Sequence, residues 1–566
     1  MPTAIQRMQT MPQMADIIIR NARIRTMDPD APRAEALAIY GNRILAVGSD
    51  AEIGGLAGSR TKVIDADGAS VLPGFNEAHM HIFQGSVSLD LLNLMGVSGF
   101  DALQDAIRTY AAQKPDETLL MATMASYIVL SETEPVTRHH LDRILPDRPF
   151  IMIAPDHHTA WANTAALKLG GLFQGRDVGI GNEVVMGDDG FANGELRETN
   201  AISPIASLTA TGGRESLGIA TGADPENLTP EQRAADIAVI KRGLAYCASM
   251  GITSVQNFDG NLYQLEIMAE LERSGDLPVR MRIPFHMKNF MDLSMLDEAV
   301  RRKERFASDR LRGDFVKVFM DGVLDSQTAF VIDGYGNRPD YDCEPLFTLE
   351  HFKEIAIKAD ALSLQIAVHA IGDGAVRLTL DGYEAAVVSN GKRDSRHRIE
   401  HIEMLHPDDI NRFAELGTVA SMQPVHAPET HGVAREPTLS NIGEHRWQYA
   451  FAWKTLKDAG ARMVFATDWP VSPLNPIDCI HEALNRPLWR DDLPDQRLTL
   501  DETLAAYTSE GAWVEFMEDR KGMLKPGYLA DLVVLSGDLD AAGAANFKSL
   551  KTLVTICDGQ ITHGSV

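Results

Sequence analysis

The sequence predicts an α/β protein: a (β/α)8 TIM barrel with insertions, joined to a small β-sandwich domain formed from both termini. Two observations carry this prediction. The middle of the chain alternates helix-like stretches with short apolar runs, as in LEHFKEIAIKADAL followed by LQIAVHA. Both ends instead contain short β-rich runs broken by Gly, Asn and Asp. Alternating helices and wholly apolar strands are typical of parallel βα units that are covered on both faces.

The domain boundaries follow from where these patterns change. Residues 1–14 contain no apolar run of the signal-peptide kind, and we expect them to form a loose tail. Residues 15–72 and 522–566 make up the predicted β-sandwich domain, with Asp558-Gly559 as a hairpin turn. Residues 73–521 are long enough for the barrel. Within them, residues 170–235 are rich in Gly, Asn, Asp and Thr, so we expect an insertion over the barrel mouth.

Composition excludes several classes of protein. The chain has 566 residues, of which 45% are hydrophobic, so it can bury a large core. A formal net charge of −26 opposes binding to nucleic acid or to anionic membranes. Four scattered cysteines give neither a disulfide framework nor a zinc-thiolate site, which fits a reducing compartment. There is no signal-like N-terminal run and no 18-residue apolar stretch. We therefore expect a cytoplasmic protein with a small-molecule substrate, and a homo-oligomer is left open.

The stretch PGFNEAHMHIF contains the first candidate site residues, His79 and His81. Side chains at positions i and i+2 of a strand point the same way, so a barrel strand ending at His81 would aim both imidazoles inward. The chain has 17 histidines, so one such pair is weak evidence by itself. The alternative is a chance pair of surface or hydrogen-bonded histidines. The location of His79 and His81 at the end of a predicted barrel strand favours metal ligation.

Four more candidates lie within or at the ends of later apolar runs. They are Lys317 in FVKVFMDG, His369 in LQIAVHAIGDG, His401 in RHRIEHIEML and Asp468 in ARMVFATDWPVSP. Each has an ordinary structural alternative: a lysine can reach outward to solvent, a histidine can be a hydrogen-bonding group, and an aspartate can cap a helix. Together with the histidine pair they supply four imidazoles, an amine and a carboxylate. Functional groups in this architecture sit where strands end.

These motifs resemble those of the amidohydrolase superfamily, and in particular its amidohydrolase-3 branch, which includes the N-substituted formamide deformylases. Five stretches carry the resemblance in order: LPGFNEAHMHIF, FVKVFMDGVLDSQTA, VHAIGD, RIEHIE and FATDWPVSP. Further matches are DHHTAWANTAAL, SMQPVH and KGMLKPGYLADLVVL. Two positions depart from the family pattern: His157 stands where the family usually has glycine, and Gly374 where arginine is commoner. The resemblance implies a barrel flanked by a β-sandwich, in agreement with the pattern analysis.

The resemblance also implies a ligand set. His79 and His81 would bind one divalent ion together with Asp468, and His369 and His401 would bind a second. Lys317 would bridge the two as a carbamate, because an N-carboxylate offers one oxygen to each ion whereas an amine cannot. The ion expected is Zn²⁺, one or two per chain. A one-metal site made by His79, His81, His369 and Asp468 is the alternative, as in the deaminase branch.

The expected chemistry follows from these ligands. Bound zinc lowers the pKa of water from 15.7 toward about 7, and an open coordination position polarises a carbonyl. Asp468 would take the proton of the metal-bound hydroxide as it attacks and deliver it to the leaving nitrogen. His158 and His426 are expected to bind substrate or to be structural hydrogen-bonding groups. Trp161 and Trp469 either line the pocket or belong to the core.

Three functions compete on this evidence. The first is hydrolysis of an amide, formamide or carbamate C–N bond of a small molecule. The second is deamination of a nitrogen heterocycle, which needs no bridging lysine such as Lys317. The third is a catalytically inactive binding homologue, which would need none of the ligands. The sequence therefore favours the first function, and no motif identifies the acyl or amine part of the substrate.

Overall fold

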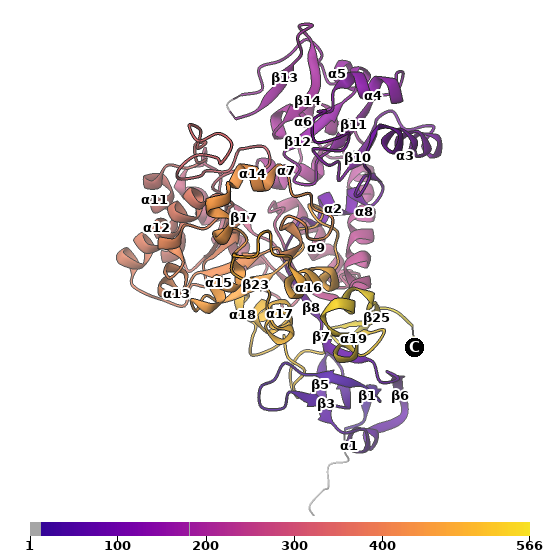
Figure 1. The fold of residues 1–566 in the computed structure, drawn as a ribbon. Helices are drawn as coiled ribbons and strands as arrows, with labels where there is room; N and C mark the ends of the chain where they lie inside the picture. The colour runs from indigo at the N-terminus through magenta and orange to yellow at the C-terminus, as the bar shows by residue number, and fades with distance from the viewer. Residues whose placement is uncertain (1–12, 180, 566) are drawn as a thin grey trace, which may run out of the picture.

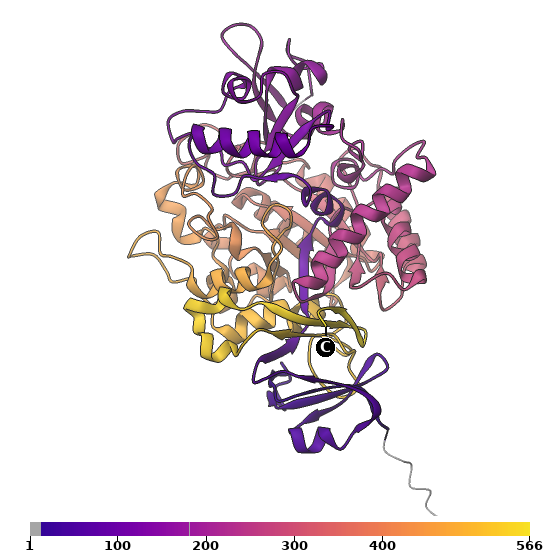
Figure 2. The same cartoon turned by 90° about the vertical axis from the view of Figure 1, so that its right-hand side faces the viewer.

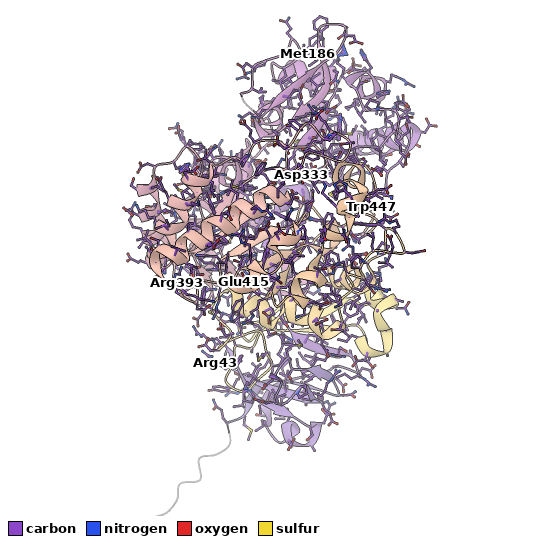
Figure 3. All side chains as sticks on the ribbon, turned by 60° about the vertical axis from the view of Figure 1, so that its left-hand side comes forward. Arg43, Met186, Asp333, Arg393, Glu415 and Trp447 are labelled. Atoms are coloured by element: carbon purple, nitrogen blue, oxygen red, sulfur yellow. The ribbon has the colours of Figure 1, made fainter. Side chains whose placement is uncertain are left out.

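The structure is a computed structural model that describes residues 13–179 and 181–565. Figure 1 shows three parts along one axis: small sheets at the end that holds the first strands, a central α/β part, and an outer lobe at the opposite end. Figure 3 labels Arg43 in the first of these parts and Met186 in the outer lobe. Of the predicted tail, residues 1–14, only Gln13 and Met14 lie within the described residues.

The two ends of the chain form two sheets, which we call the terminal sheets. The first, of order β5-β4-β1-β6, is built from N-terminal strands alone, and the second, of order β26-β25-β24-β7-β2-β3, combines strands from both ends. One hydrophobic cluster is shared between them and includes Ile19, Val71 and Leu532, so burial of apolar surface holds the two chain ends together. The strands are β1 (Ala15–Arg20), β2 (Arg23–Arg25), β3 (Arg33–Ala34), β4 (Ala36–Tyr40), β5 (Arg43–Gly48), β6 (Ala57–Asp65), β7 (Ser70–Pro73), β24 (Leu532–Leu535), β25 (Thr552–Cys557) and β26 (Gln560–His563).

The chain passes directly from the terminal sheets into the central part. Only Gly74 separates β7 from β8 (Phe75–Met80), and Figure 2 shows this segment running upward into the molecule. A Cβ atom at Gly74 would lie 2.2 Å from the side chain of Thr253, so the close approach of these two segments requires glycine. This short connection fixes where β8, and therefore the His79–His81 pair, enters the central part.

The central part is built from parallel strands in two sheets, of orders β18-β16-β15-β8 and β17-β19-β20-β21-β22-β23. Every residue of β8, β15, β20 and β21 is buried, as expected for parallel strands covered on both faces. The strands are β15 (Ile252–Asn257), β16 (Arg280–Arg282), β17 (Phe285–His286), β18 (Leu311–Arg312), β19 (Phe315–Phe319), β20 (Gln365–Ala370), β21 (Arg398–His401), β22 (Val419–Met422) and β23 (Met463–Phe465).

Helices that precede or follow these strands pack against the sheets. The longest are α8 (Pro230–Ser249), α9 (Leu262–Ser274), α11 (Leu349–Ala361) and α12 (Asp373–Asn390). The first of them begins with a capping box, in which Oγ1 of Thr229 accepts from the backbone N–H of Gln232 and the backbone N–H of Thr229 donates to Oε1 of Gln232. The alternation of strands and helices that the sequence predicts is therefore present.

The two parallel sheets lie edge to edge at both sides. At one side the chain itself joins them, because only two residues separate β16 from β17 and only two separate β18 from β19. At the other, the N–H of Asp468 donates to the carbonyl of His79, and the N–H of His81 donates to the carbonyl of Trp469. Among the described residues these links pass through irregular segments, and no closed barrel is formed by regular strand pairing, so the closed (β/α)8 barrel stays a prediction.

The outer lobe, residues 92–206, has its own six-stranded sheet of order β13-β14-β12-β11-β10-β9. Of the predicted insertion at 170–235, only β13 and β14 belong to this sheet, whereas β9 to β12 precede residue 170 and α8 begins at Pro230. The elements are β9 (Leu92–Asn93), α3 (Phe100–Gln113), β10 (Leu120–Thr123), α4 (Arg138–Ile144), β11 (Phe150–Ile153), β12 (Thr159–Ala162), α5 (Thr164–Leu169), β13 (Glu183–Met186), β14 (Ala192–Arg197) and α6 (Thr199–Ala206).

Among the described residues, no helix has both the length and the apolar character needed to cross a membrane.

Candidate metal centre

All six residues expected as metal ligands lie on, or directly after, strands of the two parallel sheets. His79 and His81 stand at the end of β8, Lys317 within β19, His369 within β20 and His401 at the end of β21. Asp468 follows β23. Because parallel strands end at one edge of a sheet, their terminal side chains can meet there. The exposed fractions are 1% for His79, 7% for His81, 1% for Lys317, 5% for His369, 5% for His401 and 4% for Asp468.

The histidines converge on the carboxylate of Asp468. Its Oδ1 lies 3.5 Å from Nε2 of His79 and 3.3 Å from Nε2 of His81. Its Oδ2 lies 3.8 Å from Nδ1 of His401. One ligand atom from each of His79, His401 and Asp468 fits within a group 4.8 Å across. The ring of His369 adjoins that of His401, with centroids 4.6 Å apart.

Two polar atoms in this cluster are buried without a hydrogen-bond partner: Nζ of Lys317 and Oδ1 of Asp468. An unsatisfied buried polar group costs about 1–3 kcal/mol, so it calls for an explanation. The Oδ1 of Asp468 lies within 3.5 Å of two imidazole nitrogens, yet it makes a hydrogen bond with neither. These atoms face a common centre instead of pairing with each other, as ligands of a divalent ion do, so the residues present fit a metal.

Lys317 is held in an apolar setting. Its Nζ lies 4.6 Å from the ring centroids of Phe258 and of Phe319. Burial lowers the pKa of Lys317 to about 7, against the opposing effect of the carboxylates of Glu400 and Asp468. Burial lowers the pKa values of His79, His369 and His401, and the charge of Lys317 adds to that effect.

Each metal-site histidine is oriented by an acceptor at its other ring nitrogen. Nδ1 of His79 lies 2.8 Å from Oε2 of Glu400, and Nδ1 of His81 lies 3.0 Å from Oδ1 of Asp259. Nδ1 of His401 lies 2.9 Å from Oε1 of Gln423, whereas for His369 it is Nε2 that lies 3.0 Å from the carbonyl oxygen of Gly322. A ring nitrogen that donates leaves the other with a lone pair. His79 and His81 therefore offer Nε2 to the centre and His369 offers Nδ1, whereas Nδ1 of His401 lies near both Gln423 and Asp468.

Electrostatics keep the cluster suited to a cation. Burial lowers the pKa values of His79, His369 and His401 well below the ordinary value, so these rings are neutral at pH 7. Burial also lowers the pKa of His81, but the nearby carboxylates of Asp259 and Asp468 outweigh this effect and raise the pKa to about 9. Burial would raise the pKa of Asp468, yet the neighbouring His79 and His81 hold it at about 2. Asp468 is therefore ionised and able to accept a proton or a metal.

The two histidines expected at the substrate pocket differ in position. The ring of His426 lies parallel to that of His401, with centroids 6.2 Å apart, and its Nε2 is buried without a partner. His158 lies farther out, on the outer lobe, where its Nδ1 is 2.8 Å from Oε2 of Glu198. Burial lowers the pKa of His158, but Glu198 raises it to about 9. His426 therefore adjoins the metal cluster, whereas His158 forms an ion pair with Glu198 on the outer lobe.

Trp161 and Trp469 lie in hydrophobic clusters. Trp161 is 3% exposed and meets the ring of Tyr127 edge-on at 5.4 Å within the core of the outer lobe. Trp469 is 4% exposed, adjoins Tyr246 at 5.6 Å and packs so closely on Gly85 that a Cβ there would lie 2.4 Å from its ring. Whether either tryptophan also lines the substrate pocket stays a prediction.

Sequence reasoning missed the acceptors that support the histidines. Glu400 directly precedes His401 in RIEH, and Asp259 follows the strand that ends at Asn257. Carboxylates at strand ends could have drawn attention to both, but only the structure shows which histidine each one contacts. His157, one of the two departures from the family pattern, has a φ of 63° and receives a hydrogen bond from Gln84 at 3.0 Å.

Known proteins resemble this chain along most of its length. It is 28% identical over 538 residues to Protein LONG AFTER FAR-RED 3 of Arabidopsis thaliana, an alignment covering 92% of this chain and 87% of that protein. It is 25% identical over 564 residues to the N-substituted formamide deformylase of Arthrobacter pascens, covering 98% and 99% of the two chains. Both alignments span all three parts of the fold.

A solved structure agrees with these sequence relatives. An uncharacterized metal-dependent hydrolase from Pyrococcus furiosus is 26% identical and superposes with a TM-score of 0.66, over 92% of this chain and 98% of that one. The profile of the Amidohydrolase family matches residues 62–563, a range that contains every residue of the metal cluster. The chain therefore belongs to the Amidohydrolase family and is a hydrolase acting on carbon–nitrogen bonds other than peptide bonds.

Proposed function

We propose that this enzyme hydrolyses an amide, formamide or carbamate C–N bond of a small molecule at a centre that holds two divalent ions, most favourably Zn²⁺. The observation that carries the proposal is the convergence of three imidazoles on the ionised Asp468, with a fourth, His369, beside them and the amine of Lys317 unpartnered. His79, His81 and Asp468 would hold one ion, and His369 and His401 the other. Bound ions of this kind acidify water and polarise a carbonyl oxygen.

Lys317 would serve as the bridge after its amine adds to carbon dioxide. In that step the nitrogen lone pair forms a bond to the carbon of CO₂ and one N–H proton leaves to solvent, which gives an N-carboxylate. The step needs a neutral amine, and burial in an apolar setting favours the neutral form of Lys317. The product would give the buried Nζ, which has no hydrogen-bond partner, two oxygens to share between the ions.

Asp468 would transfer the proton. Its carboxylate is ionised at neutral pH and its Oδ1 lacks a hydrogen bond, so it can accept the proton of the attacking water. The same oxygen would then donate that proton to the nitrogen of the breaking C–N bond, which leaves as a neutral amine. His426, whose unpartnered Nε2 adjoins the cluster, would bind the carbonyl oxygen of the substrate.

The relative named N-substituted formamide deformylase supports formamides as the first substrate class to test. In the architecture that we propose, the two parallel sheets act as one (β/α)8 barrel, the outer lobe borders its mouth, and the terminal sheets form a β-sandwich. The backbone hydrogen bonds that join β8 to the segment after β23 support that closure. We also propose a cytoplasmic location, in line with the acidic composition and scattered cysteines.

The test is a metal analysis combined with a substrate screen. Zn²⁺-loaded protein should release amine from N-substituted formamides, simple amides or carbamates, with His79→Ala as the metal-site control. Release of ammonia from nitrogen heterocycles, with no turnover of formamides, amides or carbamates, would favour the deaminase alternative. Absence of bound metal together with absence of any turnover would contradict the proposal.

A further inference from the structure

We propose that the two metal positions differ in affinity, so that the position at His79 and His81 fills first, and that Glu400 and Asp259 are the positioning residues that set this order. The inference rests on the proposed two-ion centre. The histidines differ in the partner of the ring nitrogen that faces away from the centre. For His79 and His81 this hydrogen-bond partner is a carboxylate, whereas for His369 and His401 it is an uncharged group.

Glu400 is fixed before any ion arrives. Its Oε2 lies 2.8 Å from Nδ1 of His79, and both of its oxygens accept from the guanidinium of Arg398, at 2.5 Å and 2.9 Å. Arg398 is anchored in turn by Gln256, Ser421 and the carbonyl of Ala78, at 2.6, 2.7 and 2.8 Å. These contacts come from four different strands, and Glu400 and Arg398 are fully buried. The orientation of the His79 ring therefore does not depend on a flexible side chain.

Asp259 supports His81 in a different way. Its Oδ1 lies 3.0 Å from Nδ1 of His81, and its Oδ2 accepts from the backbone N–H of Phe83 at 2.9 Å. Asp259 is fully buried, and no lysine or arginine forms an ion pair with it among the described residues. Its negative charge is therefore directed at His81 and at the start of α2 (Ile82–Ser88).

The other two histidines lack such support. Gln423 accepts from Nδ1 of His401 through a neutral amide oxygen, and His369 donates to the backbone carbonyl of Gly322. A carboxylate, Asp321, does approach His369, but its Oδ1 lies 3.7 Å from Nε2, too far for a hydrogen bond. Asp321 is already committed to the backbone N–H groups of Phe330, Ile371 and Gly372, at 2.9–3.0 Å.

The difference has a known energetic consequence. A carboxylate that accepts a hydrogen bond from a ligating imidazole makes that imidazole a stronger base, and removing such a partner typically weakens metal binding by about 10- to 100-fold. A neutral acceptor orients the ring without adding negative charge near the ion. The position that also contains Asp468 thus has three carboxylates close to it, one of which, Glu400, is paired with Arg398. The position at His369 and His401 has only Asp321 nearby, which makes no hydrogen bond with His369.

The experiment is a calorimetric titration of the metal-free, full-length protein with Zn²⁺ in bicarbonate buffer. Elemental analysis then measures the bound metal. Wild type should bind in two phases. His401→Ala should abolish the weaker phase and keep the tighter one, which assigns the order. Glu400→Gln and Asp259→Asn, which keep size and an acceptor oxygen, should each weaken the tighter phase about 10- to 100-fold and leave the weaker phase nearly unchanged.

Two further variants keep the inference testable if Glu400→Gln folds poorly because Arg398 is left without its partner. Gln423→Glu should strengthen the weaker phase. Asp360→Asn removes a carboxylate from another buried histidine, His397, where the pair is 3.2 Å apart, and should leave both phases unchanged. Circular dichroism of each metal-free variant monitors folding.

The inference is overturned if Asp259→Asn and Gln423→Glu leave both phases at wild-type affinity, or if wild type binds two ions with one affinity. Either result would leave the proposed function standing. A wild-type protein that binds no Zn²⁺ at all would instead remove the two-ion centre, and with it both proposals.

Discussion

Nε2 of His81 lies 3.3 Å from Oδ1 of Asp468, although the two residues follow β8 and β23, the first and the last strands of the two parallel sheets. The backbone explains the approach, because the N–H of Asp468 donates to the carbonyl of His79 and the N–H of His81 to that of Trp469. The contact between the first and last ligands thus depends on how the ends of the two parallel sheets meet. The predictions below address the groups gathered around it.

Lys317→Ala should lose the second ion and most of the activity. The substitution removes the amine that we propose as the bridge, and alanine offers no ligand. Because the proposed bridge is a carboxylate on a lysine stem, small carboxylic acids such as acetate should restore part of the metal content and part of the rate. Elemental analysis and turnover with and without acetate check this. Full metal content and full rate in the unsupplemented variant would show that Lys317 is not a bridge.

Asp468→Asn should separate metal binding from proton transfer. Asparagine keeps the size and one coordinating oxygen but cannot accept a proton at neutral pH. A positioned general base contributes about 10²–10⁴-fold, so kcat should fall by that order while KM changes much less. The rate has to be expressed per metal-loaded site, since metal loss would imitate the effect. A metal-replete variant running within about tenfold of wild type would falsify the role of Asp468.

Removal of metal should lower the melting temperature and reloading should restore it. An ion that binds the folded chain stabilises it by about 2.7 kcal/mol at a free concentration 100 times its Kd. Differential scanning calorimetry of chelator-treated and Zn²⁺-reloaded protein checks this. His79→Ala is the matched control, because its melting temperature should respond less to added Zn²⁺. Equal responses of the two proteins would mean that the stabilising ion binds elsewhere.

Arg280→Ala should destabilise the junction between the central part and the terminal sheets. Its guanidinium donates to both oxygens of Asp531, at 2.6 and 3.0 Å, and both side chains are 4% exposed. Breaking a buried pair leaves one uncompensated charge and costs about 3–5 kcal/mol. Lys241→Ala is the control, since its pair with Asp276 is half exposed and should contribute under about 1 kcal/mol. Urea unfolding of both variants compares them, and equal losses would contradict the assignment.

The sequence by itself determined the family and the order of the proposed ligands. His79 and His81 could be paired because strand side chains alternate with a period of two, a purely local property. The amine and carboxylate within or after later apolar runs could be recognised for the same reason, since a charged group beside a buried strand is costly unless it has a partner. The alternation of helices and strands was also local, and the structure shows it from β15 onward.

Only the tertiary structure decided which side chain forms a hydrogen bond with each ligating histidine. The contacts of Glu400 with His79, and of Asp259 with His81, join strands that are distant in sequence and depend on the register of neighbouring strands. The outer lobe likewise begins well before residue 170. The sequence did not separate its first strands from the central part, because they are apolar runs that resemble those of the central sheets. Trp469 points into the core because Gly85 leaves room for its ring. Such contacts depend on long-range packing, which no local pattern of residues encodes.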